Sequence, residues 1–249
     1  NGDHEEVIFG DVPTGKWVDA SPIPKPHNLP ALPEHFLGRN FYLQKIVSTI
    51  LKRRMITITG VPGIGKTALA IAAGRYIWKR SLFDGVFFVD LKLLRTQPRS
   101  TIASLCGEAF GLTKPMYDDN SILNAIRNQK FLLILDEADV CLDEKLNTPL
   151  CIRTFINSLL GTVSSTKVIV TSTETIGGIK HVGEFEIPIN SLSPLDAAQL
   201  FYDMRPRDIP LAEFSCTDPS KAAHKLSEHP ALKILSGHPR RIFNAVPLL

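Results

Sequence analysis

Residues 55–67 read Met55-Ile56-Thr57-Ile58-Thr59-Gly60-Val61-Pro62-Gly63-Ile64-Gly65-Lys66-Thr67, and this stretch decides the fold. Its first five residues are apolar or β-branched, as in a buried strand, and its last eight fit the pattern G-x-x-x-x-G-K-[ST]. A run rich in alanine and leucine, typical of a helix, follows at 66–78. A strand, a glycine-rich loop and a helix in this order predict a phosphate-binding P-loop.

Each residue type in this loop suits the binding of phosphate. The glycines let backbone N–H groups converge on phosphate oxygens at the positive end of the following helix. The Lys66 ammonium is expected to reach the β- and γ-phosphates, and the Thr67 hydroxyl is expected to ligate Mg²⁺. The predicted phosphate-binding residues are Gly60, Val61, Pro62, Gly63, Ile64, Gly65, Lys66, Thr67 and Ala68.

The acid that a P-loop requires follows the apolar run at 131–135. We expect Asp136 to hold the Mg²⁺ shell from the end of a neighbouring strand. Glu137, one residue further on, is placed to orient or deprotonate an attacking water. At the end of another apolar run, Thr171 or Ser172 is a candidate γ-phosphate contact, although an ordinary strand-ending turn explains these hydroxyls equally well.

Four apolar runs alternate with helical patterns along the chain. The runs cover 55–59, 85–90, 131–135 and 167–171, and the helical patterns cover 66–78, 100–110, 121–128 and 150–160. Three of the runs are continuous rather than alternating, which is typical of strands buried on both faces. Strands and helices that alternate at this spacing predict an α/β fold, a three-layer α/β/α parallel sheet of the P-loop NTPase type.

The flanks of this region predict further elements. Asn40 can cap a helix that leads into the first strand. The run at 184–189 contains Pro188, which lacks the N–H that an interior strand needs, so we expect an edge strand there. Beyond it, Ser193-Pro194 and Asp218-Pro219 are start signals for helices.

These signals divide the chain into three parts. Residues 1–33 are rich in proline and are expected to be a linker from an upstream domain. We expect the nucleotide-binding domain at 34–190 and a small all-helical subdomain at 191–249, which the end of the sequence truncates.

Composition excludes several classes of protein. The 249 residues are 44% hydrophobic and carry a formal net charge of +3, as in an ordinary globular protein. No basic stripe interleaved with aromatic residues indicates a nucleic-acid partner. No apolar run approaches the roughly 20 residues needed to span a bilayer, and the four cysteines show no CxxC spacing. We therefore expect a cytoplasmic protein with no membrane or nucleic-acid partner.

Together these motifs resemble the nucleotide-binding part of the NB-ARC family and of the wider STAND class of signalling ATPases, which are relatives of the AAA+ fold. The resemblance covers about 33–249 and is carried, beyond the P-loop and the acidic strand, by Phe36-Leu37-Gly38-Arg39, by 83–89, by 192–201 and by Gly237-His238-Pro239. It implies that Leu37, Gly38 and Arg39 help to hold adenine and that Pro239 closes the pocket from the helical subdomain. Taken alone, Arg39 reads as a surface arginine and Pro239 as the start of a helix.

The resemblance also implies a function, a regulated switch that binds ADP or ATP with Mg²⁺. ADP would keep the module monomeric, ATP would permit a homo-oligomer, and slow hydrolysis would reset it. Such modules lie between an upstream effector and a downstream sensor domain, in innate immunity or programmed cell death. The absence of an N-K-x-D guanine signature also favours adenine.

Two other functions stay open at this point. The chain could be a continuously cycling AAA+-like ATPase that acts on protein or nucleic acid, or a scaffold that binds nucleotide without turnover. One departure from the family pattern concerns how the γ-phosphate is sensed. The family often has an arginine after the fourth strand, whereas this chain reads Thr171-Ser172-Thr173.

Overall fold

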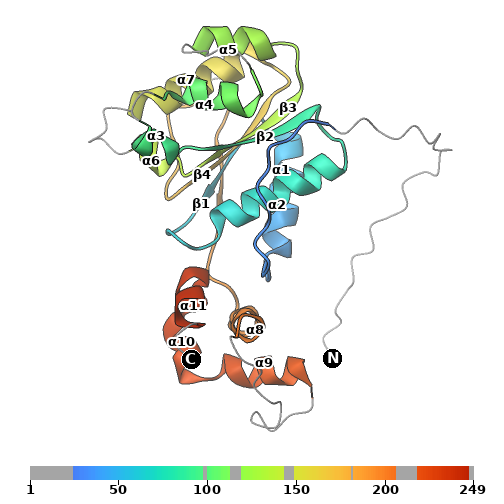
Figure 1. Cartoon of the computed structure of the whole chain (residues 1–249), viewed down its shortest axis with the longest axis vertical. Helices are drawn as coiled ribbons and strands as arrows, with labels where there is room; N and C mark the ends of the chain where they lie inside the picture. Colours follow the sequence, from blue (N-terminus) through green and yellow to red (C-terminus); the bar gives the residue numbers. More distant parts are fainter. Residues whose placement is uncertain are drawn as a thin grey trace, which may run out of the picture.

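A five-stranded parallel sheet organises the described part of the chain (Figure 1). The computed structural model describes residues 25–97, 100–112, 119–142, 149–180, 182–205 and 218–246. The strands are β1 (Met55–Thr59), β2 (Gly85–Asp90), β3 (Phe131–Asp136), β4 (Lys167–Ser172) and β5 (Phe185–Pro188). They lie in the order β2-β3-β4-β1-β5, and every pairing is parallel. The predicted α/β fold is confirmed, and β5 lies at the edge as expected.

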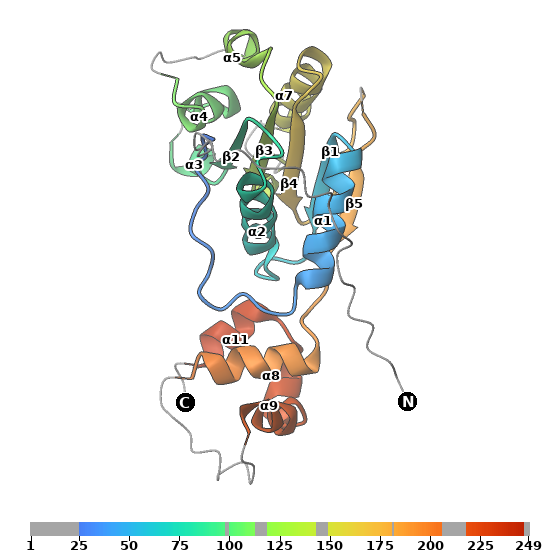
Figure 2. The ribbon, with the colours of Figure 1, turned by 90° about the vertical axis from the view of Figure 1, so that its right-hand side faces the viewer.

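Helices cover both faces of the sheet (Figure 2). One face carries α1 (Asn40–Lys52) and α2 (Lys66–Lys79), and the other carries α3 (Leu93–Thr96), α4 (Ile102–Ala109), α5 (Asp119–Ile126), α6 (Asp139–Leu142) and α7 (Pro149–Thr162). Successive residues of β3 point to opposite cores, since Leu133 packs with α4 and α7 while Leu132 packs with α1 and α2. This explains why the strand reads as a continuous apolar run.

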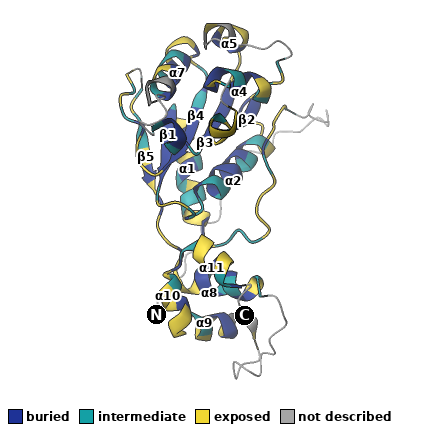
Figure 3. Cartoon of the chain, turned by 60° about the vertical axis from the view of Figure 1, so that its left-hand side comes forward, coloured by how far each residue is buried: buried dark blue, intermediate teal, exposed yellow. Residues whose placement is uncertain are grey.

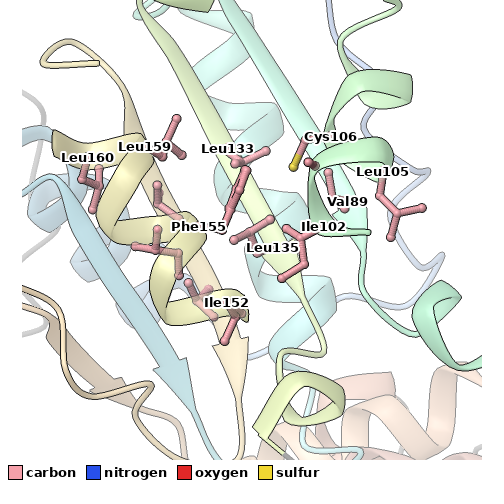
Figure 4. Packing of buried hydrophobic residues seen from close by; sticks show 14 of the residues in the cluster. Val89, Ile102, Leu105, Cys106, Leu133, Leu135, Ile152, Phe155, Leu159 and Leu160 are labelled. Carbon is pink, nitrogen blue, oxygen red and sulfur yellow. The ribbon is translucent and has the colours of Figure 1, made fainter. Parts of the chain in front are cut away.

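Figure 4 shows the core on the α7 face of the sheet. Phe155 and Leu159 of α7 and Ile102 of α4 lie over Leu133 and Leu135 of β3. All five side chains are at most 5% exposed. This packing fixes the position of β3, and therefore of the acids at its carboxyl end.

In the described part of the chain, four helices follow the sheet, and they form a separate layer below it in Figure 1. They are α8 (Pro194–Asp203), α9 (Pro219–Ser227), α10 (Pro230–Leu235) and α11 (Pro239–Ala245), called here the helical unit. As predicted, Ser193 caps α8, and its hydroxyl accepts a hydrogen bond from the N–H of Asp196 at 3.1 Å. The helical unit has a small core of its own, around Leu200 and Ile242. Figure 3 shows how much more of this unit than of the sheet is exposed.

Some expectations differ from the structure. Asn40 is the first residue of α1 and not its cap. The cap position is Arg39, whose side chain makes no capping hydrogen bond. Most of the linker expected at 1–33 lies outside the described residues, and the expected domain boundaries stay predictions. No helix in the described part of the chain is long and apolar enough to cross a bilayer. The cytoplasmic location also stays a prediction.

Candidate functional site

The loop between β1 and α2 has the conformation that a phosphate cradle requires. Gly65 caps α2 in the left-handed region, at φ 104°, which an L side chain rarely adopts. A Cβ atom added at Gly65 would meet no atom within 4 Å, so this side of the loop is open to a ligand. The amides at the start of α2 and the helix dipole both favour an anion at this place.

Lys66 lies folded back over this loop. Its ammonium donates hydrogen bonds to the carbonyl oxygens of Gly60 at 2.7 Å and Val61 at 3.3 Å. The side chain is buried, and burial lowers the pKa of Lys66, although nearby acidic side chains raise it. A buried ammonium bonded only to neutral carbonyls is well placed to bind an anion, which would replace the lost hydration.

Asp136 ends β3 and lies against the loop's threonine. The Thr67 hydroxyl donates to its two carboxylate oxygens at 2.9 and 3.0 Å, although β4 separates β3 from β1 in the sheet. The expectation that the acid ends a strand next to β1 is therefore wrong. The contact still forms because the Thr67 side chain reaches across the end of β4.

Burial raises the pKa of Asp136, and the nearby Glu137 and Asp90 raise it further, although hydrogen bonds from Thr171 and Thr67 lower it. A cation beside Thr67 and Asp136 would relieve the cost of this buried carboxylate, and hydroxyl and carboxylate oxygens are ligands that Mg²⁺ prefers. No group of three or more histidine, cysteine, aspartate or glutamate side chains that could hold a metal ion occurs among the described residues. Bound Mg²⁺ would then take its other ligands from phosphate and water.

Thr171 lies behind Asp136, not on the open side of the loop. It is fully buried, its hydroxyl donates to the Asp136 carboxylate at 2.6 Å, and it accepts the Glu137 N–H at 2.9 Å. Ser172 similarly donates to Asp139 at 3.1 Å. A phosphate contact would have to break these bonds, so the expectation that Thr171 binds phosphate does not fit this geometry. Thr171 instead positions the two acids.

Glu137 turns away from the strand in a left-handed conformation, at φ 59°. This conformation is costly for a residue with a side chain and is kept only where the surroundings fix it. Its carboxylate pairs with the Lys92 ammonium at 3.0 Å, and it lines the same cavity as Lys66. Glu137 is thus positioned beside the phosphate loop, where a water could be held.

A cavity of about 870 Å³ opens between the sheet and the helical unit. This volume lies within the range for pockets that hold small ligands. The cavity is lined by the phosphate loop and the start of α2, by the segment before α1, by Glu137, and by α8 and α11. In Figure 2 the segment before α1 descends beside α2 and crosses above the helical unit. Segments far apart in the sequence therefore enclose one space.

The loop residues fall into two groups. Gly63, Ile64, Gly65, Lys66, Thr67 and Ala68 line the cavity. Gly60, Val61 and Pro62 are not among the lining residues, and their carbonyl oxygens bond to Lys66 and to His238. The predicted set is therefore brought together, with its last six members facing the cavity.

The residues that the family resemblance assigned to adenine are only partly in place. Leu37 and Pro239 line the cavity, and Pro239 also begins α11. Gly38 is not a lining residue, because it packs so closely on α8 that an added Cβ would lie 2.5 Å from Asp196 Cγ. It is placed to fit against the helical unit instead.

Arg39 lines the cavity but is not the surface arginine that its residue type suggested. It is 4% exposed, and its guanidinium donates to the carbonyl oxygens of Asn190 at 2.7 Å and Ile64 at 2.8 Å. It therefore ties the phosphate loop to the segment that leads into the helical unit.

Sequence reasoning missed several lining residues, among them Phe36, Leu200, Met204, Arg240, Phe243 and Asn244. On α11 a signal was available, because Pro239, Arg240, Phe243 and Asn244 fall on one helical face. The other face of α11 carries Ile242, which packs in the core of the helical unit. Phe36 comes from a segment outside the helices and strands. Leu200 and Met204 come from α8 and its C-cap, where the sequence indicates the helix but not which of its apolar residues reach the cavity.

Comparison with known proteins identifies relatives of this arrangement. The family profile described as NACHT domain matches residues 54–208. An uncharacterised protein of Mycobacterium tuberculosis is 28% identical over 170 residues, which are 68% of this chain and 40% of that protein. This chain thus spans less than half the length of that relative.

Two solved structures are similar. Domain III of the replication initiation protein DnaA from Thermotoga maritima aligns with a TM-score of 0.51 and 13% identity, over 85% of this chain and 82% of that one. A STAND protein with a tetratricopeptide repeat sensor from Pyrococcus horikoshii aligns with a TM-score of 0.49 and 21% identity, over 87% of this chain and 30% of that one. At this level of identity the DnaA likeness concerns the fold alone.

Proposed function

The chain belongs to the NACHT family of STAND-class P-loop NTPases, and from this premise we propose that it is a signalling switch controlled by adenine nucleotides. The STAND class expected from the sequence is confirmed, and within that class the matching family is NACHT rather than NB-ARC. ADP holds the module monomeric, ATP with Mg²⁺ permits a homo-oligomer, and slow hydrolysis resets it. Innate immunity or programmed cell death is the proposed setting, with an effector domain upstream and a sensor domain downstream.

The observation that carries this proposal is the cavity shared by the phosphate loop and the helical unit. A ligand there contacts Lys66 and Thr67 on one side and α8 and α11 on the other. ATP and ADP differ at the phosphate end, beside the loop. A nucleotide can bias the arrangement of the two parts only by its difference in affinity for the two states. A ligand in a shared cavity changes its contacts when the two parts move, which is how such a difference would arise.

Each proposed role follows from a contact. Thr67 and Asp136 would hold Mg²⁺, which when bound neutralises charge on the phosphates. Lys66 turns from the loop carbonyls to the phosphate oxygens. Glu137 orients or deprotonates the attacking water from the cavity wall, and Thr171 fixes both acids in place.

Leu37, Phe36 and Met204 give the cavity an apolar part that suits a base. The proposed preference for adenine over guanine rests on the family and on the missing N-K-x-D guanine signature. A titration of the apo protein with ATP and GTP in parallel tests this choice, and equal affinities would remove the adenine assignment.

Three measurements on the same 249-residue chain test the switch. They are the identity of the nucleotide carried through purification, the steady-state rate of ATP hydrolysis, and the molar mass in ADP and in a non-hydrolysable ATP analogue. A switch retains ADP, turns over slowly and gains mass only in the ATP analogue. Brisk hydrolysis would instead indicate a continuously cycling ATPase, and binding without turnover or a change in mass would indicate a scaffold.

A further inference from the structure

The proposed function assigns no role to residues 25–30, called here the strap, which lie along the outer edge of β2. His27 forms a parallel bridge with Val86, and the Val86 N–H donates to the carbonyl oxygen of Pro26 at 3.2 Å. Among the described strands, β2 pairs with β3 alone, so its outer edge would otherwise present unpaired backbone groups. The strap therefore covers the edge of the sheet.

Asn28 continues this pairing with its side chain. Its Oδ1 atom accepts the Phe88 N–H at 2.6 Å, and its amide nitrogen donates to the Phe88 carbonyl oxygen at 2.8 Å. An asparagine side chain carries both an acceptor and a donor, so this one residue satisfies both backbone groups of Phe88. Asn28 itself is exposed, and its two bonds fasten the strap to β2.

Helix α2 holds the strap at both of its ends. The Trp78 Nε1 atom donates to the carbonyl oxygen of Lys25 at 2.7 Å. The Arg75 guanidinium donates twice to the carbonyl oxygen of Pro30, at 3.0 and 2.7 Å. Between these ends, Leu29 is 6% exposed and packs in the core on the α2 face of the sheet. The strap is therefore bound to two elements of the sheet domain along its whole length.

The strap leads directly into one wall of the cavity. Most of residues 31–39 line the cavity, whereas residues 25–30 do not. Within the described part of the chain, residues 31–38 are placed by apolar packing and make no hydrogen bond of their own. The nearest hydrogen bonds are those from Arg75 to Pro30 on one side and those of Arg39 on the other. The wall thus depends on the strap for one of its two anchors.

This wall borders the part of the cavity in which the proposed function places the base, beside Phe36 and Leu37. We propose that the strap positions this wall, and so sets the affinity for the base of the nucleotide through contacts outside the cavity. The inference rests on the proposed function, because it needs a nucleotide whose phosphates lie on the loop. By linkage, displacement of the strap from β2 weakens nucleotide binding, and a bound nucleotide keeps the strap in place by the same factor.

The test compares ADP with pyrophosphate, which carries two phosphates without the base, in the presence of Mg²⁺. Asn28→Ala and Arg75→Gln each remove two hydrogen bonds that hold the strap. We expect ADP affinity to fall about tenfold in each variant and pyrophosphate affinity to stay within about twofold of wild type. Calorimetric titration measures ADP, and competition against ADP measures pyrophosphate. Arg75→Lys can still donate to Pro30, so it should recover most of the ADP affinity.

Asn157→Ala is the matched control. The Asn157 side chain also bonds one N–H and one carbonyl of another segment, since it accepts the Lys180 N–H at 2.7 Å and donates to Gly178 at 3.1 Å. It lies on α7 and does not line the cavity. We expect its ADP affinity to equal that of the wild type.

Hydrogen exchange in the wild type tests the same coupling without any variant. ADP should slow exchange of the Phe88 amide, which donates to Asn28, more than exchange of the Lys180 amide, which donates to Asn157. Pyrophosphate should not produce this difference. If the strap variants do not fold or pyrophosphate does not compete, this measurement with ADP decides, and equal slowing at the two amides overturns the inference.

Two results of the titrations also overturn the inference. One is wild-type ADP affinity in both strap variants, and the other is an equal loss for ADP and pyrophosphate, which would indicate a general effect on the fold. The proposed function fails separately, because its failure requires that ADP does not bind the wild type or that Lys66→Ala binds ADP as the wild type does.

Discussion

Asp136 is a buried carboxylate whose partners in the protein are hydroxyls, and this has a consequence for stability. Its pKa is raised, mainly by burial, above the ordinary value of 3.8, so the folded protein binds this proton more readily than the unfolded chain does. Ionisation of Asp136 therefore costs stability. This cost is absent below the ordinary value and appears as the pH rises through the raised value of the folded state.

The variant Asp136→Asn cannot ionise, so it escapes this cost. Without nucleotide and in the presence of a chelator, we expect its melting temperature to rise relative to wild type as the pH goes from about 4 to about 7. Thermal denaturation of both proteins at several pH values measures the trend. A difference in melting temperature that stays constant with pH would contradict this prediction, whatever its sign.

The same variant should lose the dependence of nucleotide binding on Mg²⁺.

Lys66 is the cation of the phosphate loop, and its removal should abolish binding. Lys66→Ala removes charge-assisted hydrogen bonds to the phosphates, and we expect nucleotide affinity to fall about 100-fold or more. Calorimetric titration with ADP and ATP measures the loss. Lys79→Ala, on an exposed residue in the last turn of the same helix, serves as the control. Wild-type affinity in Lys66→Ala would refute the role.

Glu137 should affect hydrolysis and not binding. Glu137→Gln keeps the shape of the side chain but removes the base, so we expect hydrolysis about 100-fold slower or more with ATP affinity unchanged. Lys92→Gln breaks the same 3.0 Å ion pair while leaving the base, and it controls for the loss of that pair. Single-turnover hydrolysis measures both. An ordinary rate in Glu137→Gln would show that another group activates the water.

At the level of residues, the sequence allowed predictions for those residue types that the chemistry of the P-loop motif requires. The contact between Thr67 and Asp136, beside Lys66, could be predicted because phosphate and Mg²⁺ demand these residue types together. Their roles toward the ligand stay predictions. Thr171 and Arg39 were interpreted less well, because their roles depend on neighbours from distant parts of the chain. Thr171 acts on Asp136 across a strand pairing, and Arg39 acts on Ile64 and Asn190.

Among the elements, the turn from α10 into α11 sets the position of the helical unit. Gly237 adopts φ 64°, and an added Cβ would lie 2.3 Å from the Leu192 carbonyl oxygen. Its own carbonyl accepts the Leu192 N–H at 2.8 Å, so the turn is held against the chain that leaves the sheet. A side chain at this position would push α11 away from α8.

Gly237→Ala should therefore lower the free energy of unfolding by more than backbone strain alone explains. Gly111→Ala is the matched control, because Gly111 also has a left-handed φ, 71°, but open space around it. We expect roughly 1–2 kcal/mol for Gly111→Ala, the cost of the left-handed conformation, and a larger loss for Gly237→Ala. Denaturant unfolding of both variants measures the difference, and equal losses would contradict the clash with Leu192.

The elements themselves were predicted closely, because continuous apolar runs and proline start signals are local features. β1 and β2 have the predicted bounds, and β3 and β4 extend one residue further, to Asp136 and Ser172. Local sequence patterns did not predict the order of the strands in the sheet. Which strands pair depends on how the crossover helices pack, so the place of β4 between β1 and β3 could not be inferred from the runs.

At the scale of the whole molecule, two sets of hydrogen bonds among the described residues lie at the junction between the sheet and the helical unit. One set consists of the bonds from the start of α11 to Pro62 and Gly63. The other is the pair of bonds from the Arg39 guanidinium to Ile64 and Asn190. Both include residues of the phosphate loop, so a change of ligand at the loop acts directly on this junction.

The cavity at the junction was the part least accessible to sequence analysis. Its walls come from segments around residues 31–39, 63–71, 192–204 and 239–244, together with Glu137. Among these segments, only the phosphate loop carries a sequence motif that by itself indicates which ligand it binds. The other segments contribute mainly through their position, and positions of distant segments follow from the packing of the whole chain.

The central claim is that a nucleotide lies between the sheet and the helical unit, with its phosphates on the loop at 60–67. A crystal structure of the chain with Mg²⁺ and a non-hydrolysable ATP analogue tests this most directly. We predict phosphate density at the N–H groups that begin α2, a cation beside Thr67 and Asp136, and the base between Leu37 and α11. Density for the analogue elsewhere, with Lys66 still bonded to the carbonyls of Gly60 and Val61, would contradict the claim.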